Sequence, residues 1–205
     1  MTVSTTSLIF DLGAVVVDWN PRYLFARRIT DPERLDHFLA EVCSPAWNSR
    51  LDIGEPAAEL VEERSAEFPE WAEEIRAYLD QWPRMLGDPI PGMPELLAEL
   101  HNRGVPLFAL TNWSAETWPF ALERFPLLTV FRDILVSGEV RLVKPDPAIY
   151  RLALDRFGLD AATTLFIDDK IDNVRGAQQV GIDSVQFSSA ARLRTHPTVA
   201  SALAS

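Results

Sequence analysis

Polar residues with complementary chemistry flank four apolar segments of this chain. They are Asp11, Thr111-Asn112, Lys144 and Asp168-Asp169. Together they provide a carboxylate that could act as a nucleophile, a hydroxyl and amide pair, a cation and an acid pair. Carboxylates gathered without a counter-charge would repel one another and partly protonate, so the cluster predicts a hard cation. Mg²⁺ suits such a site, because it binds oxygen ligands and keeps open coordination positions. Lys144 and the metal ion would then direct positive charge at a phosphate.

A parallel sheet would bring these residues together, because predicted strands and helices alternate along the chain from residue 91 onward. Ligands collect at the carboxyl ends of the strands in such sheets. Asp11 follows the first predicted strand, which begins at Leu8, breaks at Gly13 and resumes over residues 15–17. Further strands are predicted at residues 105–110, 134–137, 164–167 and 184–187, and helices at residues 93–103, 116–124, 147–157 and 173–180.

Helical spacing replaces the strand pattern between residues 18 and 88. Thr30 and Glu33 predict a capping box at the start of one helix, and a second helix is predicted from Glu55. A third predicted helix is marked by one apolar stripe, made of Trp71, Ile75, Leu79, Trp82 and Leu86. We therefore predict a core of residues 1–17 and 89–205 and a cap of residues 18–88, which could lie over the strand ends as a lid.

The composition predicts a globular protein of acidic character. The chain has 205 residues, of which 47% are hydrophobic, and a formal net charge of −11. Nucleic acids and anionic membrane surfaces are not expected as partners, because both require a basic surface. Cys43 is the single cysteine, so no intramolecular disulfide can form. Residues 1–6 lack the features of a signal peptide. No apolar run is long enough to span a membrane. We expect a cytoplasmic monomer or homodimer.

Four motifs resemble those of the haloacid dehalogenase superfamily of hydrolases. They are Phe10-Asp11-Leu12-Gly13-Ala14-Val15, Leu110-Thr111-Asn112, Val143-Lys144-Pro145-Asp146-Pro147 with Ile149-Tyr150, and Phe166-Ile167-Asp168-Asp169 with Asp172-Asn173. Their order and spacing agree with the family over nearly the whole chain. The resemblance implies an α/β fold, with a Rossmann-like three-layer parallel-sheet core and an inserted cap of the four-helix type. Within the superfamily, the motifs are most similar to a bacterial phosphatase that acts on α-D-glucose 1-phosphate.

The resemblance implies Mg²⁺-dependent transfer of a phosphoryl group from a small phosphate ester to Asp11, followed by hydrolysis of the aspartyl phosphate. Thr111 and Asn112 would hold phosphoryl oxygens, and Lys144 would stabilise the nucleophile and the developing charge. The implied Mg²⁺ ligands are Asp11, Asp168, Asp169 and the backbone carbonyl of Gly13.

Gly13 is the main departure from the family pattern, because most family phosphatases have a second Asp at this position as general acid and base. General acid–base catalysis contributes about 10²–10⁴-fold, so water, another group or an easier leaving group must compensate. An anomeric hydroxyl leaves more readily than an ordinary alcohol, which is consistent with a sugar 1-phosphate as substrate.

Two alternative functions remain open. A 2-haloacid dehalogenase would also lack the second Asp, although halide displacement needs no metal and gives no role to Asp168-Asp169. A weakly active or inactive member of the fold could instead serve as a binding or regulatory protein. Three further residues could face substrate: Asn20, Arg22 and Trp113. Asn20 and Arg22 flank Pro21 and could equally form a hinge turn. Trp113 could equally be a packing residue.

Overall fold

A five-stranded parallel sheet lies at the centre of the computed structural model, which describes residues 7–204. The strand order is β5-β4-β1-β6-β7, with β1 at Ser7–Phe10, β4 at Leu107–Thr111, β5 at Ile134–Val136, β6 at Thr164–Asp168 and β7 at Asp183–Gln186. The predicted α/β fold is confirmed. The expectation about a signal peptide concerns residues 1–6, which lie outside the described residues.

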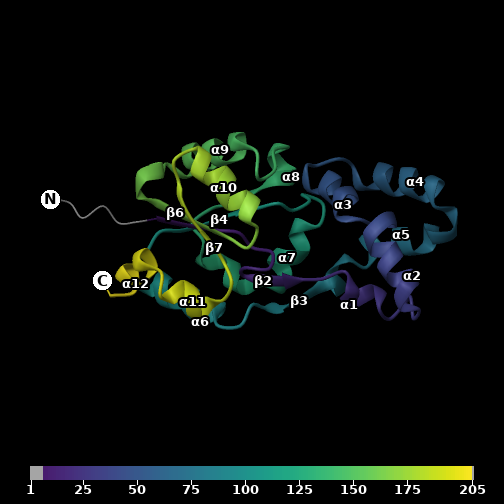
Figure 1. Ribbon diagram of the computed structural model, residues 1–205, viewed down its shortest axis with the longest axis horizontal. Coiled ribbons are helices and arrows are strands. Elements are labelled where there is room, and N and C mark those ends of the chain that lie inside the picture. The colour runs from purple at the N-terminus through teal and green to yellow at the C-terminus, as the bar shows by residue number, and fades with distance from the viewer. Residues whose placement is uncertain (1–6, 205) are drawn as a thin grey trace.

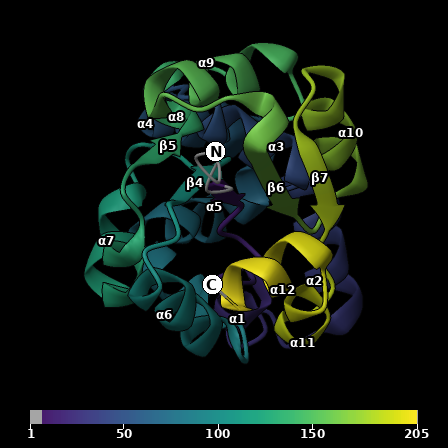
Figure 2. The ribbon, with the colours of Figure 1, turned by 90° about the vertical axis from the view of Figure 1, so that its left-hand side faces the viewer.

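Helices cover both faces of the sheet and give the core three layers (Figure 2). The helices α9 (Pro147–Phe157) and α10 (Ile171–Gln179) cover one face, and α6 (Met93–Asn102), α11 (Ala190–Arg194) and α12 (Pro197–Ala204) cover the other. Alternate residues of β1 enter different clusters, since Ile9 packs with the α9 side and both Leu8 and Phe10 pack with the α6 side. Shorter helices complete the core: α7 (Trp118–Arg124), η4 (Pro126–Val130), α8 (Ser137–Val140) and η5 (Ala161–Thr163).

A second group of helices lies beyond one end of the sheet (Figure 1). It contains α1 (Arg22–Phe25), α2 (Pro32–His37), η1 (Phe38–Val42), α3 (Pro45–Asp52), α4 (Ala57–Glu67), η2 (Pro69–Trp71), α5 (Ala72–Asp80) and η3 (Trp82–Met85). We call this group the helical cap. Its centre is aromatic: Phe25 lies 4.6 Å from Phe38 and 5.9 Å from Tyr78 between ring centroids.

A short antiparallel pair of strands connects the helical cap to the core. The strand β2 (Val17–Trp19) leads into the cap, and β3 (Leu86–Pro89) leads out of it. The division of the chain after residues 17 and 88 stays a prediction. Among residues 7–204, no helix has the length and apolar character needed to cross a membrane.

Two predictions of secondary structure within the first ninety residues are wrong. Residues 12–16 form a turn instead of a resumed strand: Ala14 adopts a φ of 58°, and the Leu12 carbonyl accepts hydrogen bonds from the N–H groups of Val16 and Val17. The expected helix through Leu86 ends at Asp80, because Pro83 has no N–H to continue it, and β3 begins at Leu86. A buried apolar run does not by itself distinguish a strand from a turn or helix.

The start of α2 and the whole of α3 also differ from the sequence predictions. Asp31, not Thr30, is the N-cap of α2, and its side chain accepts a hydrogen bond from the backbone N–H of Arg34. The helix α3 was not predicted. Its start has clear signals, since Ser44 is an N-cap that bonds the N–H of Trp47 and Pro45 occupies the first turn.

Candidate active site

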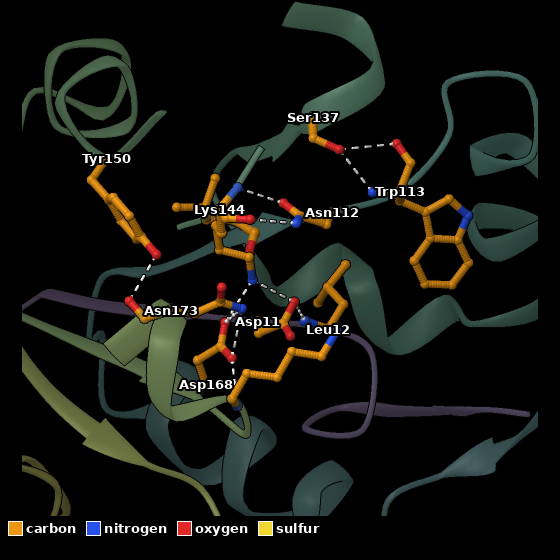
Figure 3. A network of polar contacts seen from close by, with 11 residues as sticks. Asp11, Leu12, Asn112, Trp113, Ser137, Lys144, Tyr150, Asp168 and Asn173 are labelled. Carbon is orange, nitrogen blue, oxygen red and sulfur yellow. Dashed lines mark hydrogen bonds and ion pairs between the residues drawn. The ribbon is translucent and has the colours of Figure 1, made fainter. Parts of the chain in front are cut away.

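Three predicted site residues lie at one edge of the sheet because their strands are parallel neighbours. Asp11 directly follows β1, Thr111 ends β4 on one side of it, and Asp168 ends β6 on the other. Figure 3 shows Asp11 and Asp168 pointing toward the ammonium group of Lys144, which comes from the loop before α9. The predicted meeting of these residues is therefore observed.

Lys144 lies between the two carboxylates. Its Nζ is 2.8 Å from Asp11 Oδ1 and 2.7 Å from Asp168 Oδ2, and it donates a third hydrogen bond to the Leu110 carbonyl at 2.9 Å. The side chain is 1% exposed. Burial lowers the pKa of Lys144, but the two carboxylates outweigh burial and hold that pKa above its usual value. The ammonium is therefore charged, and its three donors are fixed.

Asn112 positions the Lys144 loop with its side chain. The Asn112 amide donates to the Lys144 carbonyl at 3.0 Å and accepts from the Lys144 N–H at 2.9 Å. Because this pairing uses both ends of the amide, the expected contact of Asn112 with phosphoryl oxygens stays a prediction. Thr111, buried at the end of β4, is the other residue predicted to hold those oxygens.

Asp168 is fully engaged within the protein. Besides Lys144, its oxygens accept hydrogen bonds from the Asn173 amide at 3.0 Å and from the Lys170 N–H at 2.8 Å. Asn173 is itself held by Tyr150, whose hydroxyl donates to the Asn173 carbonyl at 2.7 Å. This network orients Asp168 toward Lys144 (Figure 3).

Three carboxylates could hold a metal ion. Asp11, Asp168 and Asp169 each offer one oxygen, and these oxygens lie within 4.8 Å of one another. The oxygen Asp169 Oδ1 is buried and has no hydrogen-bond partner among the described residues. Burial and the charge of Asp168 raise the pKa of Asp169. A buried oxygen without a partner, within an all-oxygen donor set, fits a hard divalent cation.

Asp11 is held by one of its two carboxylate oxygens. Both Lys144 and the Leu12 N–H, at 2.7 Å, bond to Oδ1. Burial raises the pKa of Asp11 to about 6, with Lys144 acting against this shift and the neighbouring carboxylates adding to it. The fixed Oδ1 leaves Oδ2 as the oxygen available for bond formation.

Gly13, two residues beyond Asp11, has open space around it. A Cβ at this residue would meet no atom within 4 Å, and its φ lies outside the left-handed region. The backbone therefore does not require glycine here, and the missing carboxyl of this position is a chemical difference without a steric cause.

The three remaining predicted residues have other contacts in the structure. Asn20 accepts a hydrogen bond from the Arg22 N–H at 2.9 Å, as expected for a turn around Pro21, and Arg22 forms an exposed ion pair of 2.6 Å with Asp36. Trp113 is 5% exposed and packs between two other tryptophans, with its indole directed away from Asp11 (Figure 3). Their roles in substrate binding stay predictions.

Sequence reasoning missed Asp52, the last residue of α3. Its carboxyl accepts a hydrogen bond from Asn48 at 3.0 Å, and its electrostatic neighbours include Asp11 and Lys170 at the sheet edge. Burial raises the pKa of Asp52 to about 7. The signals at Ser44-Pro45 could have revealed the helix, but they could not have shown which way its last residue points.

Residues 40–187 match the family described as haloacid dehalogenase-like hydrolase. The chain belongs to this family. It is a hydrolase.

Two curated relatives and one solved structure illustrate the range of the family. The sesquiterpene phosphatase astK of Aspergillus oryzae is 29% identical over 184 residues, which cover 89% of each chain. The (S)-2-haloacid dehalogenase 4A of Burkholderia cepacia is 29% identical over 98 residues, or 48% of this chain and 42% of that one. A haloacid dehalogenase family enzyme from Bacteroides thetaiotaomicron, solved as a magnesium complex, superposes with a TM-score of 0.72 at 20% identity and covers 94% of this chain and 100% of its own. The last similarity supports the fold.

Proposed function

We propose that this hydrolase is a Mg²⁺-dependent phosphatase of small phosphate monoesters that works through an aspartyl phosphate on Asp11. A sugar phosphate such as glucose 1-phosphate is the proposed substrate. The observation that supports this function most directly is the buried Oδ1 of Asp169, which lies near Asp11 and has no hydrogen-bond partner within residues 7–204. A reaction that uses a metal ion explains this oxygen and halide displacement does not.

The chain's own residues suit the proposed roles at the metal. Asp11, Asp169 and the Gly13 carbonyl are the proposed ligands, and Asp168 is a further candidate although both of its oxygens accept hydrogen bonds. When bound, Mg²⁺ supplies positive charge to the phosphoryl oxygens and reduces their repulsion by the carboxylates. In a chain with a net charge of −11, an anionic substrate needs such local positive charge.

Asp11 and Lys144 would perform the first chemical step. Asp11 attacks phosphorus with Oδ2, and the bond between phosphorus and the ester oxygen breaks as the aspartyl phosphate forms. Lys144 keeps Asp11 oriented through Oδ1 and offsets negative charge as the phosphoryl group transfers. Thr111 is proposed to hold a phosphoryl oxygen. Water then attacks the same phosphorus, which frees Asp11 and inorganic phosphate.

The choice of a sugar 1-phosphate rests on Gly13. With no carboxyl at that position, a leaving oxygen that departs easily is favoured, and an anomeric oxygen meets this condition better than a primary alcohol. Phosphatases among the relatives, including astK over most of the chain, support the ester class without defining the sugar.

A dehalogenase is the second candidate, favoured by Gly13 and by the relative from Burkholderia cepacia. That match covers less than half of either chain. A carboxylate can displace halide without a metal, so this candidate leaves the acidic cluster without a function. A binding or regulatory protein would leave Asp11 and Lys144 equally unexplained.

The deciding experiment measures released inorganic phosphate and released halide in parallel, with Mg²⁺ and with a chelator. We expect phosphate release from glucose 1-phosphate or aryl phosphates that requires Mg²⁺ and is abolished in Asp11→Asn, a variant that keeps the shape of the side chain. Halide release that persists with the chelator would favour the dehalogenase. Full phosphatase activity in Asp11→Asn would exclude the covalent mechanism.

A further inference from the structure

Asp52 of the helical cap lies beside the loop that follows β4, because the Ser137 hydroxyl that donates to the Asp52 carbonyl also accepts a hydrogen bond from the Trp113 N–H at 2.9 Å. Its carboxyl interacts electrostatically with Lys170 and with Asp11. Asp52 is therefore a cap residue that lies beside the loop after β4 and within electrostatic range of the loops that follow β1 and β6.

Two hydrogen bonds fix both the backbone and the side chain of Asp52. The Ser137 hydroxyl donates to the Asp52 carbonyl at 2.5 Å, and the Asn48 amide donates to Asp52 Oδ2 at 3.0 Å. Asn48 is oriented in turn by the Tyr78 hydroxyl, which donates to Asn48 Oδ1 at 3.0 Å. Since Tyr78 lies in the aromatic centre of the cap, the packing of the cap determines where the carboxyl points.

Glycines at the contact between cap and core allow the backbone after α3 to lie close to the backbone of the core. A Cβ on Gly54 would lie 2.6 Å from the Gly138 carbonyl oxygen, and a Cβ on Gly138 would lie 2.5 Å from the Ala115 nitrogen. The backbone of the cap thus approaches the core without intervening side chains, two residues beyond Asp52. The close approach places the end of α3 directly against the core.

The position of Asp52 is unfavourable for stability. A carboxylate in the last turn of a helix opposes the helix dipole, and burial adds a desolvation cost. Asp11 raises the pKa of Asp52 further, whereas Lys170 and the hydrogen bond from Asn48 lower it, and the net result is a pKa of about 7. The neighbouring Tyr78 stays protonated, because burial holds its pKa well above the usual value. A group that exchanges protons near neutral pH is suited to acid and base catalysis.

We propose that Asp52 is the general acid and base of the reaction and performs from the cap the proton transfers for which Gly13 has no side chain. The inference rests on the proposed phosphatase function. In the first step, the protonated Asp52 gives its proton to the ester oxygen as that oxygen leaves phosphorus and Asp11 bonds to phosphorus. In the second step, the ionised Asp52 takes a proton from the attacking water as the bond between Asp11 and phosphorus breaks. The sum is one ester and one water converted to one alcohol and one phosphate.

The test compares wild type, Asp52→Asn and the control Asp80→Asn with Mg²⁺ present. Asp80 is an exposed carboxyl on α5, so its substitution changes the charge of the cap without touching the sheet edge. The substrates are 4-nitrophenyl phosphate, whose leaving group departs without a proton, and phenyl and alkyl phosphates, whose leaving groups need one. Far-UV circular dichroism and Mg²⁺ affinity establish that each variant is folded.

For Asp52→Asn, we expect kcat/KM to fall about 10²–10⁴-fold on alkyl phosphate and far less on 4-nitrophenyl phosphate. A burst of nitrophenolate equal to the enzyme concentration should precede slow turnover, because water would attack the aspartyl phosphate without a base. The decline of kcat/KM for phenyl phosphate above about pH 7 should disappear. Asp80→Asn should match wild type.

An equal loss on every substrate, with no burst and an unchanged pH profile, would overturn the proposal and leave Asp52 as a binding or structural residue. Full activity of Asp52→Asn on alkyl phosphate would also overturn it. Failure of the underlying phosphatase function would be recognised separately, since wild type would then release no phosphate or Asp11→Asn would remain active.

Discussion

The side chain of Asn112 and the backbone of Lys144 hold each other by two hydrogen bonds, one in each direction. The two residues are 32 positions apart in the chain. Because the pair fixes where the Lys144 side chain begins, and Nζ then reaches Asp11 and Asp168, the geometry of the charged cluster depends on an amide that touches neither carboxylate.

Replacing Asn112 by Asp should remove the hydrogen bond that the side chain donates to the Lys144 carbonyl. The new carboxylate can still accept from the Lys144 N–H, but it would face the Lys144 carbonyl without a donor. We expect kcat to fall by at least tenfold and the free energy of unfolding to fall by about 1–3 kcal/mol. Steady-state kinetics and urea unfolding measure the two effects. The exposed Asn102 at the end of α6 gives a control, because Asn102→Asp should leave kcat unchanged and lower the free energy of unfolding only slightly, by opposing the helix dipole.

Asp168 and Asp169 should respond differently to the loss of one carboxylate oxygen. Asp169→Asn should weaken Mg²⁺ binding, so that high Mg²⁺ recovers part of the activity. Asp168→Asn should leave Lys144 with one buried carboxylate partner fewer, a change that Mg²⁺ does not repair. Activity titrations with Mg²⁺ separate the two cases. An unchanged Mg²⁺ requirement in Asp169→Asn would remove Asp169 from the metal site.

Asp52→Asn should stabilise the protein at alkaline pH while it impairs catalysis. Between the ordinary aspartate pKa of 3.8, which applies to the unfolded chain, and the folded pKa of about 7, the native state keeps a proton on Asp52 that the unfolded state has released. The free energy of unfolding therefore falls as pH rises through this range. The variant lacks this loss. At pH 8, without metal, we expect the free energy of unfolding of the variant to exceed that of wild type by at most about 4 kcal/mol. At pH 5.5 we expect a smaller difference.

Denaturant unfolding of wild type, Asp52→Asn and Asp80→Asn at both pH values tests this expectation. If the difference in the free energy of unfolding between Asp52→Asn and wild type is the same at pH 5.5 and at pH 8, the Asp52 carboxyl has no raised pKa in the native state.

Gly13→Asp should change substrate preference if leaving-group chemistry limits the rate. The structure offers room for the new side chain, since a Cβ would meet no atom within 4 Å. A carboxyl at this position should assist the poorer leaving group more, so kcat/KM should rise more for glucose 6-phosphate than for glucose 1-phosphate. A folded variant with an unchanged ratio, or a wild type that prefers the 6-phosphate, would show that contacts with the cap set the preference.

The sequence predicted the core of the fold and the charged cluster well because both depend on local signals. A short buried strand followed by a polar residue, as at Phe10-Asp11 and Ile167-Asp168, gives the strand and the position of the side chain together. The cap was predicted less well. The orientation of Asp52 depends on contacts such as the bond from Ser137, 85 positions away, which no local pattern encodes.

The two-stranded connection between cap and core also constrains the order in which cap opening and catalysis can occur. The strand β2 begins directly after the turn of residues 12–16, and that turn begins beside Asp11. If the cap swings outward to admit substrate, β2 and β3 are the connections about which it must move, and Asp52 leaves the sheet edge. Opening and chemical competence would thus exclude each other, so the cap would have to close over the substrate before Asp52 could act.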